Sequence, residues 1–352
     1  MSVRMGNHQM NLKSLFAIVL CFFVTSCGST PSSPPAPTAG TPELTRLTFV
    51  TDWKAQAEHG GFYQGVAKGI YKAHGIDLRI MQGGPEVNVP QLLAGGAADF
   101  GMGSNGFIPL NLVHEGAPIR AVLAVFQKDP QVLMTHPRAD IRSLKDMKGK
   151  PIMISDAATS TFWPWLKSKY GFTDSQKRKY TFNLAPFLVD KNAIQEGYVS
   201  SEPYTAEKEG KFKPNVFLLA DNGYPGYANM VLVTQKQIDE KPMLVQEFVN
   251  ATIESWVDYL YGDSSPGNAL IKKDNPEMMD DLIAQAIEKM RAYGIAVSGD
   301  ATTLGLGAMT DERWKTFFET MSTEGLYDPH LDYKKGYDLQ FVNKKIALDK
   351  IH

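Results

Sequence analysis

Cysteine is almost absent from this sequence. Of 352 residues only two are cysteine, Cys21 and Cys27, and both lie near the N-terminus. The rest of the chain therefore lacks a disulfide framework, thiolate metal ligands and a cysteine nucleophile. Seven histidines, at positions 8, 59, 74, 114, 136, 330 and 352, show no metal-ligand spacing. We expect no metal site and no cofactor.

An excess of positive charge is also missing. The sequence has 36 Lys and Arg against 38 Asp and Glu, a net charge of −2, which offers no electrostatic attraction for nucleic acid. The one long apolar run, Leu15–Val24, is too short for the roughly 20 helical residues that span a bilayer. Hydrophobic residues at 43% and aromatic residues at 11% indicate a globular chain. Its length predicts two domains or lobes.

The N-terminus has the pattern of an export signal. Arg4 and Lys13 precede the apolar run, and small residues follow it. Val24–Cys27 (VTSC) resembles the bacterial lipobox, in which the cysteine is acylated. We expect residues 1–26 to be a signal peptide, Cys27 to carry lipid, and the Pro- and Ser-rich residues 27–45 to form a flexible tether. This predicts a membrane-anchored periplasmic lipoprotein; an ordinary signal peptide with an incidental cysteine is the alternative.

Strand-like and helix-like segments alternate along the rest of the chain. β-branched or alternating runs predict strands at 47–50, 76–80, 98–102, 119–126, 151–154, 216–220 and 230–234, with 182–189 extended. Apolar spacing predicts helices at 61–74, 89–94, 107–115, 161–170, 244–261, 276–293 and 311–324. Such alternation predicts right-handed βαβ units and a largely parallel sheet.

Several short motifs, taken in order, resemble one known family. They are Thr51–Trp53 (TDW), His59–Tyr63 (HGGFY), Gln91–Gly101 (QLLAGGAADFG), Ser143–Lys150 (SLKDMKGK) and Gly197–Pro203 (GYVSSEP). Together they resemble the SsuA/THI5-like (NMT1-like) solute-binding proteins over roughly residues 45–340. These proteins supply ABC importers of sulfonates, nitrate or pyrimidine precursors of thiamine.

The resemblance implies an α/β chain with a type II periplasmic-binding-protein fold, in which two α/β lobes enclose a ligand cleft. It implies a first part of lobe 1 at 46–135, lobe 2 at 136–229, and a return to lobe 1 with C-terminal helices at 230–352. The expected partners are a small-molecule ligand and the permease and ATPase subunits of the importer.

Ligands of such sheets bind at the carboxyl ends of the strands, which directs attention to the residues that follow them. In the first lobe these candidates are Asp52, Trp53, Glu58, His59, Tyr63, Gly103, Ser104 and Asn105. Rings offer flat surfaces and carboxylates accept hydrogen bonds from amino groups; core packing, solvation and helix capping are the alternatives. Gly101–Gly106 matches G-x-G-x-x-G, but without a following acidic residue it does not favour a dinucleotide.

In the second lobe and its return, the candidates are Thr159, Ser160, Thr161, Trp163, Glu202, Tyr227 and Asn229. Hydroxyls at a helix start suit a polar ligand or simply cap the helix. The resemblance implies that the loop at 159–161 contacts the ligand. It also implies that Glu202 binds an amino group, as a glutamate does in pyrimidine-binding members; a solvated surface acid is the alternative.

The candidate residues include acids and aromatics but no arginine, which favours a neutral or cationic flat ring over an oxyanion. A thiamine-pyrimidine precursor is the first choice, with riboflavin and sulfonate- or nitrate-type anions as alternatives. A catalytic alternative is the THI5-type pyrimidine synthase. Its lysine and histidine would fall at Gly103 and Phe107, and its cysteine motif is absent. We therefore expect a binding protein and not an enzyme.

Overall fold

The structure, a computed structural model, describes residues 43–84 and 86–351. The expected signal peptide, Cys27 and all but the end of the expected tether lie outside the described residues. Within the described part of the chain, no helix has the combined length and hydrophobicity needed to cross a bilayer.

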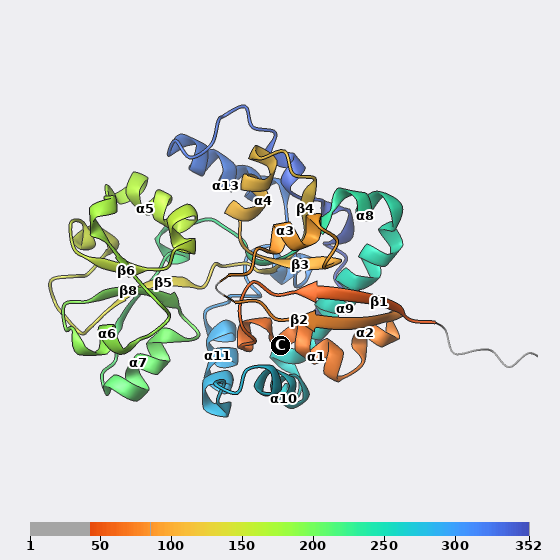
Figure 1. Ribbon diagram of the computed structural model, residues 1–352, viewed down its shortest axis with the longest axis horizontal. Helices are drawn as coiled ribbons and strands as arrows, with labels where there is room; N and C mark the ends of the chain where they lie inside the picture. Colours follow the sequence, from red (N-terminus) through yellow and green to blue (C-terminus); the bar gives the residue numbers. More distant parts are fainter. Residues whose placement is uncertain (1–42, 85, 352) are drawn as a thin grey trace, which may run out of the picture. The chain divides into compact units, whose positions relative to one another are not determined.

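Two five-stranded sheets organise the chain (Figure 1). The first sheet has the order β2 (Ile76–Met81), β1 (Thr45–Val50), β3 (Phe100–Asn105), β10 (Ala228–Thr234) and β4 (Ile119–Phe126). The second has the order β7 (Lys177–Lys179), β6 (Ile152–Ile154), β8 (Ile194–Tyr198), β5 (Gln131–Thr135) and β9 (Asn215–Leu218). We call the first sheet with its helices lobe 1 and the second sheet with its helices lobe 2.

Both sheets have the same strand order and the same mixture of directions. In each, the strand in fourth place, β10 or β5, runs antiparallel to both neighbours, while the other four run in one direction. The expected largely parallel sheet is therefore interrupted once in each lobe. Each antiparallel strand is the first one after the chain crosses from the other sheet.

These crossings fall at residues 127–130 and 219–227, which we call the two crossovers. The expected lobe boundary at 135 was too late, because β5 pairs with β8 and β9 of lobe 2. The expected return at 230 is two residues after the start of β10 at Ala228.

Helices cover both faces of each sheet (Figure 1). Lobe 1 carries α1 (Gly60–Ala67), α2 (Ile70–Ala73), α3 (Val89–Ala94), α4 (Phe107–His114), α8 (Gln235–Glu240), α9 (Pro242–Tyr261), α10 (Ser265–Asp274), α11 (Asp280–Ala292), α12 (Ala301–Leu304) and α13 (Asp311–Thr323). Lobe 2 carries α5 (Phe162–Tyr170), α6 (Ala185–Val189) and α7 (Glu202–Gly210).

Two local expectations differ from the structure. The helix expected at 61–74 is divided by Gly69, whose φ of 70° is a left-handed conformation that ends α1 and precedes α2. The segment expected to be extended at 182–189 contains α6. There the Asn183 side chain accepts a 2.9 Å hydrogen bond from the Ala185 amide, and Pro186 lies in the first turn, a favourable position for proline.

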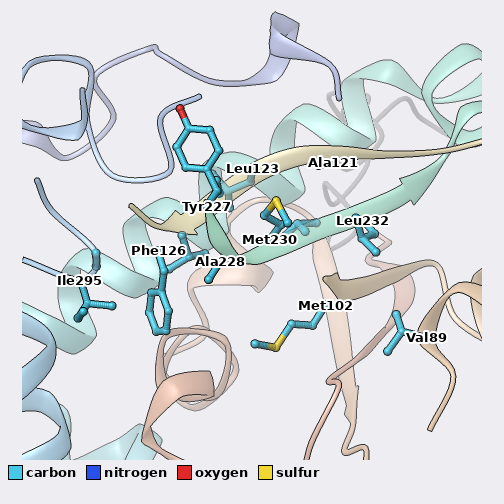
Figure 2. Packing of buried hydrophobic residues seen from close by; sticks show 14 of the residues in the cluster. Val89, Met102, Ala121, Leu123, Phe126, Tyr227, Ala228, Met230, Leu232 and Ile295 are labelled. Carbon is cyan, nitrogen blue, oxygen red and sulfur yellow. The ribbon is translucent and has the colours of Figure 1, made fainter. Parts of the chain in front are cut away.

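The core of lobe 1 is aromatic and tightly packed around its central strands. Phe248 of α9 stacks on Phe100 of β3, with ring centroids 3.9 Å apart, and Phe49 of β1 stacks on Phe62 of α1 at 4.1 Å. On β4 and β10, apolar side chains such as Leu123 and Met230 fill the interior (Figure 2). Burial of such side chains contributes about 1.5–3 kcal/mol each. The ends of β1 and β3 are thereby held in fixed positions.

Candidate functional site

An acid, a serine and a histidine meet where β1 and β3 end. Ser104 Oγ donates a 2.5 Å hydrogen bond to Asp52 Oδ2, and His59 Nε2 lies 3.3 Å from Asp52 Oδ1. The His59 side chain is buried and the Asp52 side chain is 20% exposed. Apart from this 3.3 Å approach to each other, Asp52 Oδ1 and His59 Nε2 have no hydrogen-bond partner, and His59 Nδ1 has none. Buried polar atoms are normally satisfied, so this pair is a candidate for contact with a polar ligand once the lobes separate.

Close helix packing sets the position of His59. An added Cβ at Gly60 would lie 1.9 Å from the Tyr259 ring, and one at Gly61 would lie 2.2 Å from the Trp256 ring. Only glycine allows α1 to approach α9 this closely. The HGG motif therefore has a structural basis: its two glycines seat α1 and hold His59 beside Asp52.

Glu58 connects the two lobes from a buried position. Ser200, which follows β8 of lobe 2, donates its hydroxyl to Glu58 Oε1. The Ser200 carbonyl in turn accepts from the Gln285 amide of α11, and Asn229 Nδ2 donates to the Glu58 carbonyl at 2.6 Å. Glu58 is only 2% exposed. Elements from both lobes thus meet at one carboxylate.

Two further carboxyls lie on the lobe 2 side. Glu196 of β8 accepts a 2.8 Å hydrogen bond from the Ser155 amide, and its burial raises the pKa to about 7. Glu202, at the start of α7, accepts from the Tyr198 amide at 2.7 Å. Its burial raises the pKa to about 6. Glu196 was not predicted from the sequence because β8, with the mixed polar and apolar sequence IQEGY, was not recognised as a strand.

Aromatic rings complete the group. Trp53, partly exposed after β1, packs on Phe182 of lobe 2 with ring centroids 4.2 Å apart and an interplanar angle of 43°. Phe182 also lies 5.1 Å from Tyr180, whose hydroxyl donates to Glu202 Oε1 at 3.4 Å. Phe182 and Tyr180 were not among the residues predicted from the sequence. Their part in the group depends on how lobe 2 meets lobe 1, which no local pattern encodes.

We call Asp52, Trp53, Glu58, His59, Ser104, Glu196, Ser200, Glu202, Tyr180 and Phe182 the candidate site. Its members come from both lobes and include four carboxylic acids but no lysine or arginine. Within the described residues, no group of three or more His, Cys, Asp or Glu side chains is arranged to hold a metal ion.

Three expected aromatic residues lie away from the candidate site. Tyr63 donates to Asp274 of α10 at 3.1 Å, and Trp163 donates to Asp174 at 3.0 Å inside lobe 2. Tyr227 lies beneath the guanidinium group of Arg313, 4.1 Å from its ring centroid. Each ring is buried and packs within the protein. An aromatic residue that follows a strand can pack in the core or contact a ligand, and the sequence alone did not distinguish these two roles.

The remaining expected residues have mixed positions. Asn105 accepts from the Phe107 amide at 3.1 Å, and Gly103 faces Leu232, so both support β3 and the start of α4. Asn229 supports Glu58 as described above. Thr159 and Ser160 are exposed in the turn Ala157–Ser160, whereas Thr161 is buried at the start of α5. The Ala158 amide of this turn donates to the Ser155 hydroxyl at 3.3 Å, and the Ser155 amide donates to Glu196, so the turn is connected to the candidate site through Ser155.

Two surface hollows lie elsewhere in the molecule. One of about 550 Å³ is lined by residues of α9 and α11, including Tyr261 and Arg291. Another of about 530 Å³ lies beside the crossovers and is lined by Lys128, Tyr224 and Arg313 among others. Neither is lined by residues of the candidate site, where side chains of the two lobes are in direct contact.

Comparison with known proteins identifies the family. The sequence profile described as NMT1/THI5 like matches residues 56–263, more than half of the chain. The chain belongs to this family. The riboflavin-binding protein RibY of Chloroflexus aurantiacus is 25% identical over 92% of this chain and 96% of its own length. The 4-amino-5-hydroxymethyl-2-methylpyrimidine phosphate synthase of Schizosaccharomyces pombe is 25% identical over 41% of this chain and 42% of its own.

A solved structure supports the fold of this family member. The periplasmic aliphatic sulphonate binding protein SsuA of Escherichia coli superposes with a TM-score of 0.58 and 13% identity, over 84% of this chain and 92% of its own. Together with the two matching sheets, this confirms the expected α/β periplasmic-binding-protein fold. Because the family includes both binding proteins and a synthase, membership alone does not select between them.

Proposed function

We propose that this protein is the solute-binding component of an ABC importer and captures a flat heteroaromatic ring between its two lobes. Riboflavin is the first candidate ligand. In this proposal the protein is exported and held at the membrane by lipid on Cys27, and it delivers its ligand to the permease of the importer. The described chain then acts by closure of the lobes around the two crossovers.

The observation that carries the proposal is the chemistry of the candidate site. A partly exposed tryptophan packs on Phe182 of the other lobe, carboxyls from both lobes belong to the same group, and that group contains no lysine or arginine. A sulfonate or nitrate needs donors and positive charge around its oxygens, which four carboxylic acids oppose. A neutral ring with N–H groups at its edge can stack on the Trp53 ring and donate hydrogen bonds to the carboxyl oxygens of the candidate site.

The relatives order the candidates within that class. The sequence alone favours a thiamine-pyrimidine precursor, but RibY is similar over nearly the whole chain and is a riboflavin-binding protein. Riboflavin therefore moves ahead of the pyrimidine. An aminopyrimidine is the second candidate because Glu196 Oε2, which has no hydrogen-bond partner, can accept from an exocyclic amino group.

Binding is favoured over catalysis by the residues themselves. The positions of the synthase lysine and histidine hold Gly103 and Phe107, and both are buried, Gly103 against Leu232. Ser104 donates its hydroxyl to Asp52 Oδ2, and neither ring nitrogen of His59 accepts a hydrogen bond from it, so the serine–histidine pair that activates a serine nucleophile is not formed here. The site is suited to hold a ligand and lacks a recognisable nucleophile.

The test is an equilibrium titration of the purified full chain, followed by the quenching of riboflavin fluorescence. Competition by a 4-aminopyrimidine, an alkanesulfonate and nitrate then reports the class of ligand. We expect riboflavin to bind and to be displaced by flat rings only. Displacement by the sulfonate or nitrate, or no binding of any flat ring, would contradict the proposal.

A further inference from the structure

Phe182 combines two unfavourable features in one residue. Its side chain is 48% exposed, and its backbone φ of 61° lies in the left-handed region. A bulky residue in that conformation is a genuine outlier, because its Cβ is crowded by the backbone. Because the ring is half exposed, its burial contributes little free energy to offset the backbone strain. We therefore expect a functional reason for a phenylalanine at this position.

The contacts of Phe182 point to the other lobe. Its ring meets Trp53 of lobe 1 at a centroid distance of 4.2 Å and Tyr180 of its own lobe at 5.1 Å. Trp53 follows β1, and Phe182 lies between β7 and α6, so the pair joins residues far apart in the chain. Phe182 thus has a left-handed backbone at the same position where its ring contacts Trp53.

The spacing shows what a ligand would require. Rings in contact lie about 3.5–4 Å apart, so the present distance leaves no room for a further ring between Trp53 and Phe182. The two residues belong to lobes connected by the two crossovers, and rotation of the lobes about these crossovers separates the rings. A separation larger by about 3.5 Å admits one flat ring with a contact on each face.

We propose that Phe182 is a specificity-determining residue, which stacks on the face of the ligand ring opposite to Trp53. In the ligand-free chain the two residues contact each other; in the complex the ligand ring lies between them. This inference rests on the proposed function and narrows the ligand to compounds with two flat faces. A tetrahedral sulfonate group provides no such pair of faces.

Two substitutions at Phe182 separate the ring from the backbone conformation. Phe182→Gly removes the ring and accepts the left-handed backbone, so it does not threaten folding. Phe182→Tyr keeps a ring of nearly the same size. Tyr293→Ala is the matched control, since it removes another exposed ring, 38% exposed, that lies after α11 and outside the candidate site.

The first readout is riboflavin affinity by fluorescence titration. Loss of one stacked face is expected to raise the Kd of Phe182→Gly about five- to tenfold, and to leave Phe182→Tyr and the Tyr293→Ala control within twofold of wild type. If Phe182→Gly binds as tightly as wild type, or more tightly, Phe182 only covers Trp53 and the inference is wrong. If the wild-type chain binds no flat ring, the proposed function fails and the inference fails with it.

The second readout needs no ligand. The other four tryptophans are at most 1% exposed, so acrylamide quenching of the tryptophan fluorescence reports mainly on Trp53. Phe182→Gly is expected to increase this quenching about twofold, because it uncovers the Trp53 ring. Unchanged quenching would show that the two rings are apart in solution, and the stacking role would be lost even if the chain binds riboflavin.

Discussion

Lobe 1 and lobe 2 place an acid and a serine on equivalent strands, in opposite order. In lobe 1 the acid Asp52 follows β1 and Ser104 lies on β3; in lobe 2 Ser155 follows β6 and the acid Glu196 lies on β8. Each pair is joined by a hydrogen bond, from the Ser104 hydroxyl in one lobe and from the Ser155 amide in the other. The shared strand order brings both pairs to corresponding sheet edges.

The difference between the two pairs is burial. The Asp52 side chain is 20% exposed and accessible to a ligand, whereas Glu196 is 5% exposed as a residue and has its pKa raised to about 7. Lobe 1 therefore presents the accessible acceptor and the tryptophan. Lobe 2 contributes acids whose charge depends on pH near neutrality. We expect the two lobes to respond differently to substitution and to pH.

The largest expected effect concerns the lobe 2 acid. Because the folded-state pKa of Glu196 is raised, its protonated form is favoured in the folded state, and this stabilisation is fully present below about pH 4.5. It is lost as pH rises toward about 7, at a cost of up to about 3 kcal/mol. Glu196→Gln should remove this part of the pH dependence and raise the Tm at pH 8. Thermal unfolding from pH 5 to pH 8 checks it.

The exposed acid Glu207 on α7 provides the control for that experiment. Glu207→Gln should leave the pH profile of the Tm unchanged. If the Tm changes with pH equally in wild type and in Glu196→Gln, Glu196 is ionised without an energetic penalty. The difference in burial between Asp52 and Glu196 would then have no effect on stability.

The next effect concerns the lobe 1 ring. Trp53→Ala should raise the Kd for riboflavin more than tenfold, because it removes a stacking face together with the burial of that face. Trp53→Phe, which keeps a smaller ring, should recover most of the affinity. Fluorescence titration measures both. An unchanged Kd for Trp53→Ala would remove Trp53 from the binding surface.

A smaller effect is expected at the buried contact between the lobes. Ser200→Ala deletes the hydroxyl that donates to Glu58 and leaves a buried carboxyl oxygen without that donor, at a cost of about 1–2 kcal/mol to the ligand-free fold in which this contact is made. The Tm should therefore fall by a few degrees. The neighbouring Ser201→Ala should not change it. Equal Tm values for the two variants would mean that this contact does not stabilise the ligand-free arrangement of the lobes.

The smallest effect is expected at the exposed contact between the lobes. Asp281 of α11 accepts from Tyr204 at 2.8 Å and from Lys208 at 2.6 Å, and the Asp281 and Lys208 side chains are nearly half exposed. Exposed ion pairs contribute about 0–1 kcal/mol. Asp281→Asn should therefore lower the Tm by less than Ser200→Ala does, with a further decrease only at low salt. A larger fall in Tm than in Ser200→Ala would show that the exposed contact contributes more than the buried one.

Much of the fold was predictable because it depends on local patterns. The expected helix at 89–94 and strand at 119–126 coincide with α3 and β4. Strand β5 was missed, and the expected boundary at 135 with it, because QVLMT was not distinguished from the preceding segment of lobe 1. Helix α6 was missed because its capping depends on single residues, Asn183 and Pro186, inside an apolar stretch.

The candidate site was predictable only in part. Asp52 and Ser104 were selected because they follow strands, and the structure brings them into contact. Phe182 was missed because its position depends on tertiary contacts of lobe 2, and Glu196 because β8 was not recognised as a strand. Trp163 was selected for its residue type, yet its indole donates to Asp174 inside lobe 2. Residue type and position after a strand therefore locate the region but not the orientation of each side chain.

A crystal structure of the full chain with riboflavin would test the account most directly. The account predicts that the isoalloxazine ring lies between Trp53 and Phe182, with its polar edge facing carboxyl oxygens of the candidate site. A riboflavin molecule bound in the hollow beside Arg313, or stacked on neither ring, would contradict it.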